Sequence, residues 1–255
     1  MTWRAIDLSG DPRRAHIEYF RSMQNPMVGV TADVDVTELA NGCREQGASF
    51  YLAFMHAAAL AANAVPELRR RIRKGGVVEY DVCGTSHVEP LPDGSYCYCT
   101  LFHDLDWAEY LPYAEAARKR CLECPSIDED EDVDGLYFVT CLPWLHYTQL
   151  IQPTAGGDES NPRISWGRYA PDWRGRLMLP VTLLAHHGLV DGVHIARFYE
   201  NLNTRLEGIE GGRPLSHNQW IVTALLKGEP RLPRMTGNPL DSLSGKLPCA
   251  ARPRG

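Results

Sequence analysis

Two adjacent histidines that follow an apolar run are the residues in this sequence best suited to chemistry. The segment LLAHHGLVDGVHIARF places His186 and His187 at the end of a strand-like stretch and reaches Asp191 and Gly192 four residues later. A histidine titrates near neutral pH, so one exposed at a strand end can remove a proton from a hydroxyl or thiol. His187 is therefore a candidate catalytic base. The same pattern also occurs in ordinary strand-to-helix connections.

Asp191 has two possible roles in this segment. Its carboxylate could act directly on the imidazole of His187, or it could hold the loop through an ion pair with an arginine elsewhere in the chain. The spacing alone does not choose between them. No Ser or Cys nucleophile is paired with His187 in a recognisable motif, so we expect general-base catalysis without a covalent intermediate.

The elements that must position these residues alternate between helices and strands, which predicts an α/β fold with a mixed sheet. Thr37 is expected to cap one helix, Pro66 to end another, and Pro92-Asp93-Gly94 to form a turn. We predict helices over residues 12–23, 37–47, 50–65, 107–121 and 191–207, and strands in MVGVTADV, 77–103, LYFVTCL, LHYTQLI, ISWGRY and RLMLPVTLLAHH. The segment NQWIVTALL after residue 209 can form one more helix.

Composition excludes several classes of function. The chain has 255 residues, and its 32 acidic and 26 basic residues give a net charge of -6 without a basic block, so nucleic-acid binding is not expected. No run is long and apolar enough for a membrane span or a signal peptide, so we predict a cytoplasmic location and no membrane partner. The Cys121/Cys124 pair lacks a second matching pair, so we predict no metal site and reduced thiols.

The histidine segment resembles the active-site signature of the chloramphenicol acetyltransferase family, type A, with its HHxxxDG motif. Further matches follow in the family's order and extend the resemblance over residues 3–207. They are Arg13-Arg14-x-His16-x-Glu18, Phe50-Tyr51-x-Ala53-Phe54, Pro66-Glu67-Leu68-Arg69, Pro143-Trp144 and Leu179-Pro180. The resemblance implies a two-layer sandwich of sheet and helices. It divides the chain into an acyltransferase domain, 1–208, and a C-terminal extension, 209–255, of unreadable role.

The resemblance also implies roles for individual residues. His187 would take the proton of the acceptor hydroxyl that attacks acetyl-CoA, and Asp191 would pair with Arg13 to fix the loop. Tyr51 and Tyr169 would lie beside CoA. The acceptor-binding positions would be Tyr19, Phe20, Gln24, Pro26, Val28, Tyr98 and Ser165, the last replacing a threonine that holds an ordered water. The family forms homotrimers whose active sites lie between subunits, so we expect self-association.

The sequence departs from the family at three positions near the expected site. The resemblance places an oxyanion-binding serine where this chain has Gln149, whose amide can also donate a hydrogen bond. Thr148, one residue earlier, would point to the opposite face of a strand. Gly188 and Val193 also differ from the usual residues. We therefore expect acetyl transfer to chloramphenicol or another hydroxylated small molecule, with two alternatives: a CoA-binding protein with impaired catalysis, or the acyltransferase core of a dehydrogenase complex.

Overall fold

A mixed β-sheet organises the chain. In the computed structural model, which describes residues 1–128 and 132–207, a seven-stranded sheet has the order β2-β10-β8-β7-β5-β6, with the short β9 paired to β10. The pairs β5/β7 and β7/β8 are parallel and the others are antiparallel. A separate three-stranded sheet, β1-β4-β3, adjoins the amino terminus.

The elements of the described residues are named in chain order. They are β1 (Trp3–Ile6), α1 (Arg14–Arg21), β2 (Met27–Asp35), α2 (Thr37–Gln46), α3 (Phe50–Asn63), η1 (Pro66–Arg69), β3 (Arg70–Arg73), β4 (Gly76–Tyr80), β5 (Gly84–Pro90), β6 (Tyr96–Leu101), α4 (Trp107–Glu123), η2 (Val133–Gly135), β7 (Leu136–Cys141), β8 (Arg163–Trp166), β9 (Ala170–Pro171), β10 (Leu177–His186) and α5 (Gly192–Glu207).

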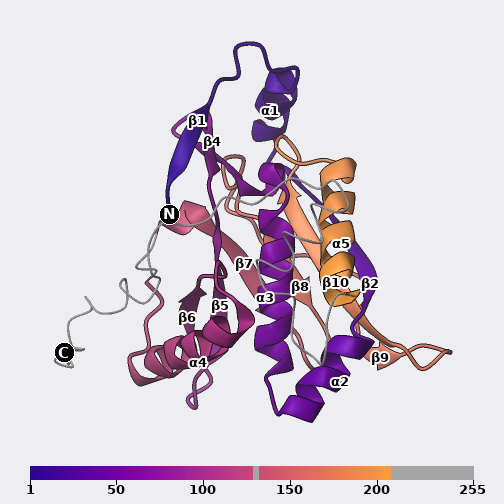
Figure 1. Ribbon diagram of the computed structural model, residues 1–255. Helices are drawn as coiled ribbons and strands as arrows, with labels where there is room; N and C mark the ends of the chain where they lie inside the picture. The colour runs from indigo at the N-terminus through magenta and orange to yellow at the C-terminus, as the bar shows by residue number, and fades with distance from the viewer. Residues whose placement is uncertain (129–131, 208–255) are drawn as a thin grey trace.

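Helices α3, α4 and α5 lie on one side of the main sheet (Figure 1). Helix α3 is almost wholly buried and rich in alanine, which lets it pack closely against α5 and the sheet. The strand residues that face it, such as Ile164, Trp166 and Leu183, are fully buried members of the core. Because strand side chains alternate, Ser165 and Thr182 point to the opposite, helix-free face.

Most predicted elements are confirmed, and two expectations are wrong. The segment LHYTQLI forms no strand, because both sides of β7 are already occupied by β5 and β8 and the chain turns after Leu142. Thr37 does not cap α2, whose N-cap is Val36. Its hydroxyl donates to Asp35 and accepts from the backbone of Leu177 instead. The expected helix in NQWIVTALL lies outside the described residues.

Candidate active site

His187 directly follows β10, an interior strand of the main sheet, where the chain turns toward α5. Its Nδ1 lies 3.0 Å from the carbonyl oxygen of Val190, and its backbone N–H donates to the carbonyl of Pro26 at 2.8 Å. Because a carbonyl can only accept, Nδ1 must carry the proton, which leaves the lone pair of a neutral imidazole on Nε2. The half-buried side chain is therefore held in the tautomer that a base needs.

His186 anchors the same turn from inside the protein. Its Nδ1 accepts a hydrogen bond from the N–H of Gly188, and its Nε2 donates to the carbonyl of Gly157 at 2.9 Å. Burial lowers the pKa of this histidine, consistent with a neutral ring. Gly188 is needed here, because a Cβ would lie 3.0 Å from the Cα of Ile17 and from Cε1 of His186. His186 is thus a structural neighbour of the candidate base.

An arginine from α1's N-cap ties the loop together. Arg13 Nη1 lies 2.5 Å from Asp191 Oδ2, and its Nη2 donates to the carbonyls of His187 and Gly188 at 3.3 and 3.4 Å. Burial opposes the charge of Asp191, but the hydrogen bond from Arg13 and the nearby His194 outweigh it and lower the pKa of the carboxyl. Of the two roles open to Asp191, this geometry favours the loop-holding one.

Two of the expected acceptor residues surround His187 directly. The ring of Phe20 stacks on the imidazole with centroids 4.3 Å apart, and Pro26 is the buried residue whose carbonyl accepts from His187. Tyr19 packs edge-on against Phe20 but is 60% exposed. Gln24 is exposed, and Val28 lies half-buried on β2. The segment that the sequence singled out therefore does lie beside the histidine.

A row of hydroxyl side chains crosses the helix-free face of the sheet. The strand register aligns Thr31 with Thr182, Thr182 with Ser165, and Ser165 with Thr140, on β2, β10, β8 and β7. The hydroxyls of Thr31 and Thr182 lie 2.7 Å apart. Gln152 joins the row, since its amide donates to Thr140 at 3.0 Å and accepts from Ser165 at 3.3 Å. Ser165 is therefore part of a polar stripe.

Gln149 is not among these contacts. It lies exposed in the loop after Trp144, whereas Gln152, three residues later, is the glutamine that lies beside Ser165. Sequence reasoning missed Thr140 and Gln152, because only the pairing of β7 with β8 brings Thr140 next to Ser165. A signal did exist in β7, where the pattern LYFVTC places a polar Thr140 on the face opposite Val139. Tyr98, on β6, shares this helix-free face.

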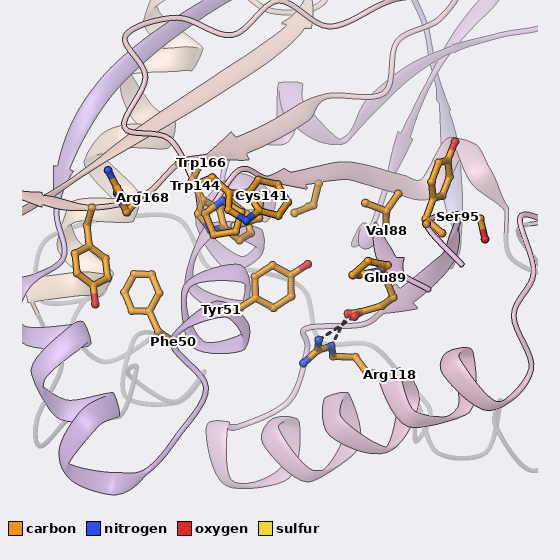
Figure 2. A pocket seen from close by; sticks show the side chains of 17 residues that line it. Phe50, Tyr51, Val88, Glu89, Ser95, Arg118, Cys141, Trp144, Trp166 and Arg168 are labelled. Atoms are coloured by element: carbon orange, nitrogen blue, oxygen red, sulfur yellow. Dashed lines mark hydrogen bonds and ion pairs between the residues drawn. The ribbon is translucent and has the colours of Figure 1, made fainter. Parts of the chain in front are cut away.

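A cavity of about 780 Å³ opens on the helix side of the sheet, beside the N-terminal end of α3. Figure 2 shows Tyr51 at its centre, Phe50 to one side and Glu89 with Arg118 at the other. Tyr51 packs against Trp166 with centroids 5.7 Å apart, and Tyr169 meets the edge of Phe50 at 5.3 Å. The two expected CoA residues, Tyr51 and Tyr169, thus line one cavity that is rich in aromatic side chains.

One charged pair, Glu89 and Arg118, lies in the wall of this cavity. Arg118 donates to Glu89 from Nε at 2.5 Å and from Nη2 at 2.9 Å, as the dashed lines in Figure 2 mark. His87 also lies 3.0 Å from Glu89. Burial would raise the pKa of Glu89, but the hydrogen bonds from His87 and Arg118 lower it to about 2. The carboxylate is therefore charged and neutralised in place, so the cavity carries little net charge there.

His187 is not among the residues that line this cavity. The chain therefore contains the candidate base and the candidate CoA cavity at separate places. Within residues 1–128 and 132–207, no group of three or more side chains is placed to bind a metal ion. In the same ranges, no helix is both long enough and apolar enough to cross a bilayer.

Comparison with known proteins identifies the chain as an acyltransferase. A family model described as chloramphenicol acetyltransferase matches residues 1–203. The chain therefore belongs to the chloramphenicol acetyltransferase family.

Individual relatives agree with this assignment. A chloramphenicol acetyltransferase of Escherichia coli is 25% identical over 224 residues, which cover 82% of this chain and 96% of that protein. One of Streptomyces acrimycini is 28% identical over 211 residues, covering 79% and 93%. A solved structure of a chloramphenicol acetyltransferase superposes with a TM-score of 0.69 at 25% identity, covering 80% of this chain and 99% of that one.

Proposed function

We propose that this protein transfers an acetyl group from acetyl-CoA to a hydroxyl of a small-molecule acceptor, with chloramphenicol, whose acetylation would inactivate the antibiotic, as the first candidate. The observation that carries the proposal is the hydrogen bond from Nδ1 of His187 to Val190, since it leaves Nε2 as a proton acceptor. Phe20 and the Arg13–Asp191 pair hold that imidazole in one orientation. Family membership supports the reaction class.

The mechanism is a direct transfer. Nε2 of His187 removes the proton of the acceptor hydroxyl while its oxygen attacks the thioester carbonyl, forming a tetrahedral oxyanion. When the oxyanion collapses, the C–S bond breaks and the CoA sulfur leaves, taking the proton back from His187. No covalent enzyme intermediate is required. The chain's contribution is to orient the base and to stabilise the developing negative charge.

Two side chains compete for the role of oxyanion donor. Gln149 stays the sequence-based prediction, but it is exposed in the single chain. The geometry favours the Thr140 hydroxyl, which lies beside Ser165. It accepts from Gln152, and its own O–H has no hydrogen-bond acceptor among residues 1–128 and 132–207, so it can donate to an oxyanion. Losing a single oxyanion donor typically costs about 2.7–4 kcal/mol of transition-state stabilisation. A substitution at each position therefore distinguishes them.

The aromatic cavity is the proposed place of the CoA substrate. Tyr51 and Tyr169 line it, and Arg168 stands at its rim with an exposed side chain that can meet a phosphate. Acetyl-CoA binding should therefore weaken in Tyr51→Ala. The acceptor would approach from the helix-free face, where Ser165 and Tyr98 lie, toward the histidine.

We also propose that the working unit is a homotrimer with active sites shared between subunits, formed by residues 1–208, with 209–255 as an extension. The single chain supports this, because His187 does not line the cavity that holds Tyr51. The test is co-expression of His187→Ala chains with Tyr51→Ala chains. If the two residues meet across an interface, mixed assemblies regain activity that neither variant has alone. Absence of recovery would indicate sites built within one chain.

The primary experiment is thiol release from acetyl-CoA with chloramphenicol as the acceptor, comparing wild type with His187→Ala and with the exposed His16→Ala as a matched control. We expect release that His187→Ala abolishes and His16→Ala leaves unchanged. If His187→Ala retained most of the turnover, His187 would not be the base. Tight CoA binding without release would favour the second candidate, a CoA-binding protein with impaired catalysis.

A further inference from the structure

Arg163 carries a guanidinium nitrogen that has no hydrogen-bond partner in the part of the chain that the structure describes. Arg163, the first residue of β8, is only 8% exposed. Its Nη2 pairs with Glu159, but its Nη1 is buried and has no hydrogen-bond partner among the described residues. A buried N–H group of a charged side chain is costly to leave unsatisfied, so such an atom calls for an explanation.

Arg163 lies on the face that carries the polar stripe. It is two residues before Ser165 on the same strand, so both side chains point to the helix-free side. The register places it between Phe138 on β7 and Leu184 on β10. Its guanidinium carbon lies 5.7 Å from the centre of the Phe138 ring. Leu184 is also two residues before His186, so Arg163 is close to the end of the sheet that carries the histidine turn.

A purely structural role accounts for only part of this arrangement. Glu159 accepts from Arg163 through one carboxylate oxygen and from the N–H of Ala155 through the other, which anchors the loop over the helix-free face. That anchoring uses Nη2 and leaves Nη1 unexplained. The pair is also neutral overall, so what remains at Nη1 is hydrogen-bonding capacity rather than excess charge.

The polar groups around Arg163 point to the chemistry of a ligand. The stripe offers the hydroxyls of Thr140 and Ser165 and the amide of Gln152 within the same face. The hydroxyls and the amide already bind one another, so an acceptor with an apolar body would leave Nη1 of Arg163 desolvated without a partner, which is unfavourable. An acceptor with a suitably placed oxygen would satisfy Nη1.

We propose that Arg163 is a specificity-determining residue, whose Nη1 donates to a trigonal oxygen, either a carboxylate or a carbonyl, borne by the hydroxylated acceptor. This inference rests on the proposed acetyl transfer and names the class of its acceptor: small polar molecules that carry both a hydroxyl and such an oxygen. Arg163 binds the acceptor and takes no part in moving the proton.

Three matched probes test the proposal on the full-length wild-type protein. 3-Hydroxypropanoate, 3-hydroxypropanamide and propan-1-ol share a primary hydroxyl and a two-carbon chain, and differ in bearing a carboxylate, a carboxamide or a methyl group. Their binding is measured by calorimetry in the presence of CoA, and their acetylation by thiol release. We expect the oxygen-bearing probes to bind about ten- to a hundred-fold more tightly than the methyl probe. The ratio between carboxylate and amide identifies which oxygen is preferred.

Substitutions then test whether Arg163 causes the preference among the three probes. Arg163→Met should remove the preference by raising the KM of the two probes that bear a trigonal oxygen, with the KM of propan-1-ol unchanged. Because this change leaves Glu159 without its ion pair, Arg163→Met/Glu159→Met serves as a second variant that removes both charges. Arg70→Met is the matched control, since it breaks an Arg–Glu pair with Glu79 in the small sheet.

The outcomes separate this inference from the proposed function. Equal binding of all three probes, failure of all of them to bind at millimolar concentration, or a preference that survives in both Arg163 variants would each overturn the role of Arg163. Arg163-dependent discrimination without acetylation of any probe would support the binding site and count against acetyl transfer. Discrimination in both binding and turnover would support both.

Discussion

Replacing Arg13 with methionine tests whether the loop around His187 must be held from α1. The change removes an ion pair whose partners, Arg13 and Asp191, are 25% and 35% exposed, a class of pair worth about 1 kcal/mol or less. It also removes two hydrogen bonds to carbonyls at 3.3 and 3.4 Å, each worth about 0.5 kcal/mol at that length. The total is roughly 2 kcal/mol of loop positioning, and if all of it were needed in the transition state, kcat would fall roughly thirty-fold.

The assay must separate positioning from binding and folding. We expect kcat to fall in Arg13→Met while the KM of acetyl-CoA stays within a factor of about two, because Tyr51 and Tyr169 are untouched. Arg14→Met is the matched control, since Arg14 forms only an exposed pair with Glu18. Urea unfolding of both variants would show whether the fold survives. Unchanged kcat in Arg13→Met, or an equal loss in Arg14→Met, would refute the reasoning.

Three further changes have defined outcomes. Phe20→Ala removes a ring stacked on His187, an interaction worth about 0.5–1.5 kcal/mol, so kcat should fall up to about ten-fold, and a larger effect on KM alone would contradict this. Burial and neighbouring histidines hold the pKa of His103 well below its usual value, so the unfolded state binds a proton before the folded state does. The free energy of unfolding should therefore fall as pH drops below about 6.5, by up to about 1.4 kcal/mol per pH unit. In His103→Gln, urea unfolding should show a shallower dependence on pH. Thr140→Val should cost at least about a hundred-fold in kcat if its hydroxyl is the oxyanion donor, whereas an equal loss in Gln149→Ala alone would return that role to Gln149.

The elements of this fold were predictable where local periodicity and local chemistry agree. Helix α3 follows from an alanine- and leucine-rich run closed before Pro66, and β10 from the apolar stretch before the two histidines. The strand predicted for LHYTQLI does not form, because a strand needs a neighbouring strand with an unpaired edge. Alternation in the sequence does not show that both edges of β7 are already paired. The helix cap predicted at Thr37 is wrong for a similar reason, because its hydroxyl accepts from the backbone N–H of Leu177, a residue far away in sequence.

In the candidate site, too, features set by local sequence could be predicted, and features set by distant contacts could not. The turn that holds His187 is encoded within a few residues, so its motif was visible in the sequence. The ion pair between Arg13 and Asp191, 178 residues apart, was inferred only through the resemblance and is present in the structure. The partnership of Thr140, Gln152 and Ser165 depends on three segments meeting in register, which no local pattern specifies.

Within a single chain, the candidate base His187 does not line the candidate CoA cavity. A base held in the correct tautomer is of use only beside a bound thioester, yet the large aromatic cavity contains neither His187 nor Phe20. The loop that borders the cavity exposes Trp144 and Ile151 at 73% and 79%, which is costly for a monomer and typical of a surface that another protein covers. If copies of the chain pair so that this loop is buried, the base of one can meet the cavity of the next. The buried hydrogen bonds of His186 and the ion pair between Arg13 and Asp191 then explain how the base keeps its position at an edge that a neighbour would complete.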